Sequence, residues 1–426
     1  MRDRWPGAVG RGHRLLHRDC VAEGNHLGDQ SRAARRSGLI GLRIAFLGTR
    51  GVPARYGGFE TAAEEIGRRL VERGHEVVVY CRTGNSDIEV SEHAGMQLVT
   101  LPAVRAKSLE TLSHTGASVS HLVSRGRRPD AVVMFNAGNA VYLPALRARR
   151  IPVATHVDGL EWKRSKWAGG GRRYYRMVEG MAVRWSDALI ADAQGIADYY
   201  NAHFDVTCDQ IAYGAPILGE VGSEKLSDLQ LKPGGYHLVV ARFEPENHVL
   251  EIVRGYRSST AALPLVVVGS APYAGEYTAA IESAAAGDER IRLIGAVWDQ
   301  DLLNQLYSNA HTYLHGHSVG GTNPSLLRAM GAGTATIAWD VAFNNQVLGP
   351  AAILFHSPET LAPAIEAAEA DLTGTSATGA ALAERAAKHY VWDDVAGAYE
   401  AMLARIASGE SIHPQARRAR RSAEEL

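Results

Sequence analysis

Glycines gather directly ahead of a helical pattern in the segment GTRGVPARYGGFETAAEE, residues 48–65. Gly57 and Gly58 stand where the predicted helix begins. Free backbone N–H groups and the helix dipole at such a start favour an anion such as phosphate. The segment has neither a GK[ST] sequence nor GxGxxG spacing, which speaks against a P-loop and against a dinucleotide-binding turn. The alternative is that these glycines serve only a tight turn between strand and helix.

A second glycine-rich turn directly precedes a predicted helix in SVGGTNPSLLRAMGAG, residues 318–333. Asn323 and Pro324 are typical of a helix start, so this turn also offers backbone N–H groups to an anionic ligand. Arg328 follows about one helical turn later. Its guanidinium donates hydrogen bonds and accepts none, so we expect it to contact a phosphate or base oxygen, or to pair with an acid such as Asp340.

Arg242 stands at the end of the strand-like run YHLVVAR, residues 236–242. A planar guanidinium binds phosphate oxygens through two parallel hydrogen bonds, which makes Arg242 a candidate phosphate ligand. Asn247 adds a neutral donor nearby in the sequence. A salt bridge from Arg242 to Glu244 or Glu246 is the alternative.

His156 stands near the end of another strand-like run, PVATHV, residues 152–157. Beside a cleft, it would donate to a sugar hydroxyl or orient a substrate; the alternative is a purely structural histidine. The basic and aromatic run WKRSKW, residues 162–167, suits an acidic acceptor, a phospholipid headgroup or a domain interface. It also suits a helix surface whose long side chains pack on their own domain.

Strand-like apolar runs alternate with helical patterns along most of the chain, and this order predicts an α/β fold with parallel sheets. The runs are 43–48, 75–81, 131–136, 152–157, 188–192, 236–242, 263–269, 291–295 and 311–315. The stretch 216–235 is rich in Gly, Pro and polar residues, and we predict it as a linker. The two halves then form two doubly wound domains facing a cleft, with ligands at the carboxyl ends of the strands.

Composition excludes several classes of protein. Of 426 residues, 46% are hydrophobic and 21% charged, as in folded globular proteins, and the net charge of −1 gives no global attraction to nucleic acid. Three distant cysteines exclude a disulfide framework and suit a reducing cytosol. The sequence contains no apolar run of about 18 residues, so we predict no membrane-spanning helix. We expect a cytoplasmic protein, with peripheral contact at the inner face of the cell membrane left open.

The predicted domain boundaries are as follows. Residues 1–42 form a disordered extension or result from a mis-assigned start codon, and 408–426 form a disordered tail. The N-terminal Rossmann-like domain covers 43–215, the C-terminal one covers 236–388, and a final helix covers 389–407.

Four blocks in this order, GTRGVPARYGGFET, HVDGLEWKR, ARFEPEN and HGHSVGGTNPSLL, resemble the GT-B glycosyltransferases of family 4. The resemblance is strongest to a bacterial, rhamnosyltransferase-like subgroup and covers about residues 43–407. It implies a GT-B fold of two Rossmann-like domains, with a nucleotide-sugar donor on the C-terminal domain and an acceptor on the N-terminal domain. It also implies that the terminal helix crosses back onto the first domain.

The resemblance assigns roles to the residues already named at strand ends and glycine turns, and it adds others that only the resemblance implies. The catalytic candidate is His156, beside the transferred sugar, and the candidates for the donor phosphates are Gly57, Gly58, Arg242 and Asn247. The candidates for the donor sugar are Gly320, Gly321, Thr322 and Asn323, those for the base are Gly295 and Val297, and those for the acceptor side are Asp158, Glu161 and Lys163.

The chain departs from the family pattern at two places. Many members carry two glutamates eight positions apart, one near the donor sugar and one on the ribose; here the matching residues are Gly320 and Arg328. A lysine that commonly holds phosphate is replaced by Asn247. Arg328 cannot accept hydrogen bonds from ribose hydroxyls, so the resemblance leaves it a ribose-side or phosphate role in a rebuilt donor pocket.

We therefore expect a glycosyltransferase that moves a sugar, such as rhamnose or another hexose, from a nucleoside diphosphate to a glycan or lipid-linked acceptor. Such transfer serves the synthesis of cell-envelope polysaccharides in bacteria. We expect no metal and no cofactor, because glycine N–H groups, helix starts and Arg242 can stabilise the departing diphosphate. In a retaining reaction that diphosphate takes the acceptor proton. The alternatives are a nucleotide-sugar epimerase of the same fold and a non-catalytic subunit that binds sugar nucleotides.

Overall fold

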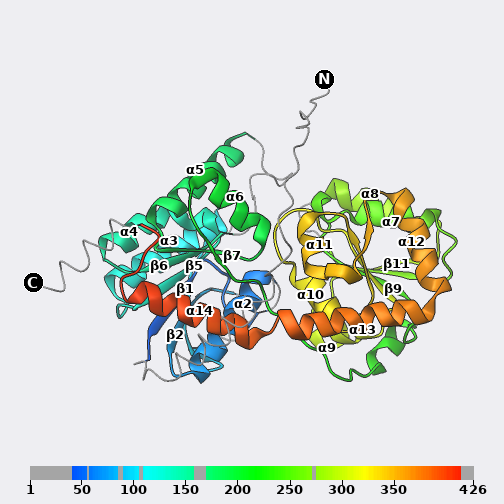
Figure 1. The fold of residues 1–426 in the computed structure, drawn as a ribbon, viewed down its shortest axis with the longest axis horizontal. Helices are drawn as coiled ribbons and strands as arrows, with labels where there is room; N and C mark the ends of the chain where they lie inside the picture. Colours follow the sequence, from blue (N-terminus) through cyan, green and yellow to red (C-terminus); the bar gives the residue numbers. More distant parts are fainter. Residues whose placement is uncertain are drawn as a thin grey trace, which may run out of the picture. The chain divides into compact units, whose positions relative to one another are not determined.

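The computed structural model describes residues 41–54, 57–84, 90–104, 109–157, 169–270 and 275–413 (Figure 1). The expected extension before residue 41, the tail beyond 413 and the acceptor-side candidates Asp158, Glu161 and Lys163 lie outside these ranges. The described chain is an α/β protein with two sheets, one in each predicted Rossmann-like domain.

The N-terminal sheet has the strand order β3-β4-β2-β1-β5-β6-β7-β8 and is parallel except where β3 pairs with β4. Its strands are β1 (Arg43–Leu47), β2 (Glu76–Arg82), β3 (Glu92–His93), β4 (Met96–Leu101), β5 (Ala131–Phe135), β6 (Val153–His156), β7 (Ala188–Ala191) and β8 (Asp209–Gln210). The helices between them are α2 (Gly58–Glu72), α3 (Glu110–Ser124), α4 (Leu143–Ala148), α5 (Gly170–Trp185) and α6 (Gln194–Phe204), with a 3₁₀ turn η2 (Ala137–Tyr142).

Both faces of this sheet are buried, which explains why its strands read as continuous apolar runs. In β1, Ile44 and Phe46 belong to one hydrophobic cluster, whereas Ala45 and Leu47 belong to the cluster on the other face. Helix α2 presents Ile66 and Leu70, one turn apart on the same face, to the first cluster.

The C-terminal sheet is parallel, with the order β11-β10-β9-β12-β13-β14. Its strands are β9 (His237–Val240), β10 (Leu265–Val268), β11 (Ile291–Gly295), β12 (Thr312–His315), β13 (Thr336–Trp339) and β14 (Ile353–Phe355). The helices that follow β9 are α7 (Val249–Ser258), α8 (Gly275–Ala285), α9 (Gln300–Ser308), α10 (Pro324–Gly331), α11 (Ala342–Leu348), α12 (Pro358–Ala370), α13 (Leu372–His389) and α14 (Trp392–Ala407). The 3₁₀ turns are η4 (Glu224–Leu229), η5 (Pro245–Asn247) and η6 (Gly349–Ala351). None of the described helices is long and apolar enough to cross a membrane.

The segment predicted as a linker, 216–235, packs in part on the C-terminal domain. Leu226 in η4 and the nearby Leu231 are buried in the same cluster as Tyr236 and Leu306. The polar composition of the segment hides these two apolar contacts, which is why it reads as a linker.

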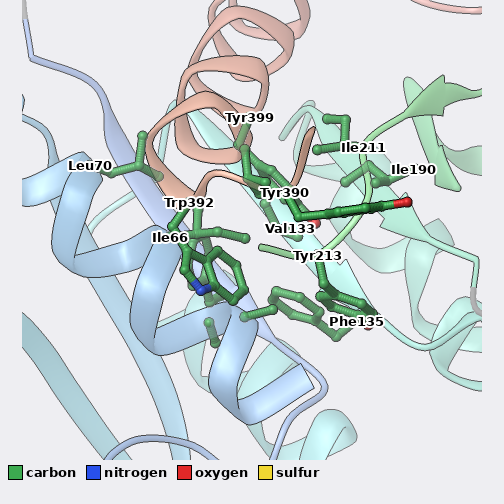
Figure 2. Close-up of a cluster of buried hydrophobic side chains, with 14 of the residues drawn as sticks. Ile66, Leu70, Val133, Phe135, Ile190, Ile211, Tyr213, Tyr390, Trp392 and Tyr399 are labelled. Atoms are coloured by element: carbon green, nitrogen blue, oxygen red, sulfur yellow. The ribbon is translucent and has the colours of Figure 1, made fainter. Parts of the chain in front are cut away.

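The chain passes between the domains at two adjoining points. Ala215 N–H donates to the carbonyl of Tyr390 over 2.7 Å, and Gly214 lies so close to the indole of Trp392 that a Cβ there would overlap the ring. Figure 2 shows Tyr213, Tyr390, Trp392 and Tyr399 converging on side chains of α2 and the N-terminal sheet. The same buried cluster continues into the C-terminal domain through residues such as Leu326 of α10.

Helix α14 packs on α2 of the N-terminal domain, as the resemblance implied, and begins at Trp392. Glu400 of α14 accepts hydrogen bonds from Arg73 over 2.8 Å and from His75 Nε2 over 3.0 Å. The direction of the second bond is fixed, because His75 Nδ1 accepts from the Leu42 N–H. These two partners hold the pKa of Glu400 below its usual range despite the opposing effect of burial.

Candidate functional site

The two glycine-rich segments predicted to meet an anion lie against each other. Gly58 is the first residue of α2 and Pro324 the first of α10. A Cβ on Gly58 would lie 3.2 Å from Pro324 Cγ and 3.8 Å from the ring of Tyr213. Each helix follows the carboxyl end of a central parallel strand, β1 or β12. The tertiary structure thus brings two helix N-termini to one place, and both ends carry partial positive charge.

The start of α10 is built as predicted. The side chain of Asn323 accepts a hydrogen bond from the Ser325 N–H over 2.9 Å, and Pro324 occupies the first helical position. Gly320 has φ of 129°, a conformation that disfavours other residues. The turn therefore requires glycine at position 320 for its backbone path.

The start of α2 already holds a carboxylate. Glu60, in the first turn and mostly buried, accepts a hydrogen bond from the Arg50 N–H over 2.9 Å. Its other carboxylate oxygen lies where a Cβ of Gly57 would be, and Gly57 has φ of 107°. An acidic side chain in this position stabilises the helix, because its negative charge interacts favourably with the positive end of the helix dipole. The phosphate role of Gly57 and Gly58 stays a prediction, and a phosphate there would have Glu60 as a near neighbour.

His156, the catalytic candidate, lies at the end of β6 with 1% of its surface exposed. Its ring stacks between Phe135 and Tyr213, with centroids 6.0 and 5.8 Å away, and Phe59 meets it edge-on. Burial lowers the pKa of His156 to about 3, so the ring is neutral at physiological pH. Neither ring nitrogen has a hydrogen-bond partner among the described residues. A neutral imidazole retains one donor and one acceptor for a ligand.

Asp192, which the sequence analysis did not single out, follows β7, the strand next to β6. Its backbone carbonyl accepts a hydrogen bond from Thr322 Oγ1 of the C-terminal domain over 2.6 Å. A Cβ on Gly321 would overlap its carboxylate. The available signal was an acid placed directly after a buried strand, in ALIAD.

Arg242 and Asn247 lie together after β9. The Asn247 side-chain amide donates to the carbonyl of Arg242 over 2.8 Å, and its oxygen accepts from His317 Nδ1 over 2.6 Å. Ser318 N–H donates to the carbonyl of Glu246 over 2.9 Å. Asn247 therefore ties the loop after β9 to the loop after β12, and the side chain of Arg242 is exposed beside them. Phosphate contacts of both residues stay predictions.

Arg328 pairs with a neutral side chain. Both of its terminal nitrogens donate to Gln300 Oε1 of α9, each over 3.0 Å. Asp340, named above as an alternative partner, accepts instead from Asn345 over 2.9 Å. The base candidates precede α9: Gly295 ends β11 with φ of 75°, and Val297 is partly buried. Arg328 thus joins α10 to the helix that follows the predicted base loop.

An aspartate pair and a histidine pair, residue types that can bind metal ions, form contacts with other residues of the chain. Asp299 and Asp301 flank Gln300; Asp299 caps α9, and both carboxylates pair with Lys225. His311 precedes β12 and bonds to the carbonyl of Ala368, whereas His315 ends the strand and bonds to the Tyr313 hydroxyl. Within the described ranges, no group of three or more His, Cys, Asp or Glu side chains is arranged to hold a metal ion.

Comparison with known families matches the two halves separately. Residues 42–216 match the model described as "Domain of unknown function (DUF1972)", and residues 236–371 match "Glycosyl transferases group 1". No curated protein matches the sequence.

Solved structures share the architecture over most of the chain. Sucrose-phosphate synthase from Thermosynechococcus elongatus is 18% identical with a TM-score of 0.74, covering 86% of this chain and 99% of that one. Anabaena HepE in complex with UDP-glucose is 15% identical with a TM-score of 0.68, covering 86% and 99%. A glycosyltransferase from Rickettsia africae is 11% identical with a TM-score of 0.67, covering 88% and 100%. At these identities the likeness establishes the fold, which is GT-B. The matched glycosyl transferases group 1 model and this fold together support the assignment of the chain as a glycosyltransferase.

Proposed function

We propose that the protein transfers a neutral sugar from a nucleoside diphosphate to a glycan or lipid-linked acceptor, without a metal ion and with retention of the anomeric configuration. The observation that carries this proposal is the meeting of the α2 and α10 N-termini at Gly58 and Pro324. Two helix starts converging on one place favour a ligand with several negative charges, such as a diphosphate. The HepE complex with UDP-glucose, on the same fold, supports a nucleotide sugar as the donor.

The chemistry follows from where negative charge develops. Cleavage of the sugar–phosphate bond leaves charge on the diphosphate, and backbone N–H groups of residues 320–323 face that charge at the start of α10. Arg242 adds a guanidinium, and charge-assisted hydrogen bonds of this kind are stronger than neutral ones. The departing phosphate oxygen takes the acceptor proton, so the reaction needs no separate base. His156, neutral and buried, orients the sugar through a ring nitrogen.

The test is a panel of UDP-, GDP- and dTDP-sugars with the full-length protein. The cognate donor raises the melting temperature, because a ligand that binds only the folded state stabilises it. Transfer or slow hydrolysis of that donor persists in EDTA. If no sugar nucleotide stabilises the protein, the proposal is wrong, and if activity disappears only with chelator, its metal-free part is wrong.

Arg242→Ala gives a sharper test of the phosphate site. The loss of a charge-assisted hydrogen bond of roughly 1.5–3 kcal/mol lowers donor affinity about 10- to 100-fold. The matched control is Arg254→Ala, which removes an exposed guanidinium from α7. Equal affinities of the two variants would argue against the phosphate role of Arg242 and favour a non-catalytic subunit if donor transfer is also missing.

A further inference from the structure

Asp192 carries an unusual carboxylate at the contact between the two domains. The residue is 4% exposed, and Oδ1 has no hydrogen-bond partner within the described part of the chain. Burial raises the pKa of Asp192 to about 7. A buried carboxylate with an unsatisfied oxygen costs free energy, so folding alone does not favour it.

The side facing Asp192 is the glycine turn predicted to hold the donor sugar. Gly321 leaves room for the carboxylate, because any Cβ there would overlap it. Gly321 is not among the glycines with positive φ, so its backbone conformation does not explain the glycine. The missing side chain does explain it, since the carboxylate occupies that space. Thr322 holds the glycine turn against Asp192, because its hydroxyl donates to the Asp192 backbone carbonyl over 2.6 Å.

The neighbouring groups leave the carboxylate without a positive partner. Tyr399 of α14 is fully buried near Asp192, and burial together with the nearby carboxylate raises the pKa of that phenol. His156, at the end of the adjacent strand, is neutral. The described elements around Asp192 therefore supply backbone, hydroxyl and aromatic groups, and no basic side chain is paired with its carboxylate.

We propose that Asp192 is a sugar-binding residue that the N-terminal domain contributes to the donor site: its unpartnered oxygen accepts a hydrogen bond from a hydroxyl group of the sugar held by the turn 320–323. This inference rests on the proposed function. It also gives specificity, because a carboxylate in this position repels a donor whose sugar is a uronic acid. The residue thus compensates, from the opposite domain, for the absence of an acidic side chain at Gly320.

The experiment separates the sugar contact from the phosphate contact. UDP-glucose, GDP-mannose and dTDP-rhamnose are each compared with their free nucleoside diphosphates by calorimetry, in the wild type and in Asp192→Asn. The neutral Asn is nearly the same size, so the variant keeps the packing. We expect its affinity for the free diphosphate to stay within twofold, and its affinity for the best sugar donor to fall at least tenfold.

A second variant reaches the same oxygen from the other side. Gly321→Ala places a methyl group against the carboxylate and displaces it without removing the charge, and we expect the affinity for the best sugar donor to fall at least tenfold. The control is Asp198→Asn, an exposed carboxylate on α6 that accepts from Gln194. In the wild type, the matching uronic acid donor binds at least tenfold more weakly than the neutral donor, and Asp192→Asn narrows this difference.

Proton release provides a readout that a purely structural role would not produce. A hydroxyl that donates to the carboxylate stabilises its charged form, so sugar-donor binding at pH 6 releases more protons than binding of the free diphosphate. Asp192→Asn abolishes this excess. The inference is overturned if Asp192→Asn lowers the affinities for the sugar donor and for the free diphosphate equally, or if it lowers neither affinity. If the wild type binds none of these nucleotides, it is the proposed function that fails.

Discussion

The backbone of Gly58 at the start of α2 faces the ring of Pro324 at the start of α10, so closely that a Cβ on Gly58 would lie 3.2 Å from Pro324 Cγ. This contact joins residues 266 positions apart in the sequence, and it is the point at which the two domains present their helix dipoles to the same place. Substitutions on either side of it therefore report on donor binding directly.

Gly58→Leu is expected to weaken donor affinity about tenfold, because a side chain at this position pushes the two helix starts apart and misplaces the N–H groups by about an ångström. The measurement is a titration with the sugar nucleotide that the panel selects, together with the melting temperature. Gly180→Leu is the matched control, since Gly180 of α5 has no heavy atom within 4 Å of its added Cβ. A Gly58→Leu variant that binds the donor like the wild type would contradict the placement of the diphosphate.

Arg328→Ala is expected to lower affinity for the free nucleoside diphosphate at least fivefold, whereas Gln300→Ala lowers it less than twofold. The carboxamide of Gln300 takes one N–H from each terminal nitrogen and leaves three donors of the guanidinium for a ligand. Calorimetry of both variants and of the double variant measures this. Equal effects of the two single changes would show that Arg328 serves only to join α10 to α9.

Stability is expected to fall as the pH drops below about 6.5. Burial lowers the pKa of His156 and His315 to about 3, and burial is also the main reason why the pKa of His114 and His237 is about 4. Between these values and 6.5 the unfolded chain binds protons that the folded protein does not, so each histidine lowers the unfolding free energy by about 1.4 kcal/mol per pH unit. Asp192 has the opposite effect, because its pKa is raised to about 7 and the folded protein therefore binds one proton in this range that the unfolded chain does not.

Urea unfolding at pH 7.5, 6.0 and 5.0 measures this dependence. Because the ring of His114 is fully buried, His114→Phe is expected to reduce the pH dependence of the unfolding free energy by the contribution of one histidine. The control is His203→Phe, on an exposed position of α6. A slope unchanged by His114→Phe would contradict the neutral, buried state of that ring.

Local patterns were enough to predict the central part of both sheets. Each of the nine predicted strands is present, because a strand buried on both faces must be apolar at every position. The strands that were missed are β3, β4, β8, β13 and β14. Of these, β3, β8 and β14 have two or three residues and β4 is interrupted by the exposed Gln97 and Thr100, whereas the length and burial of β13 do not explain why it was missed. Short edge strands leave too weak a periodic signal to separate them from loops.

The sequence by itself determined the α/β fold, the two glycine turns and the polar residues at strand ends, since all of these depend on neighbours within one turn or one strand. Only the tertiary structure decided which side chains face them. It placed Asp192 against Gly321 and Gln300 on Arg328. Partners of this kind come from distant segments brought together by parallel strand order and by domain contact, and no local pattern encodes that proximity.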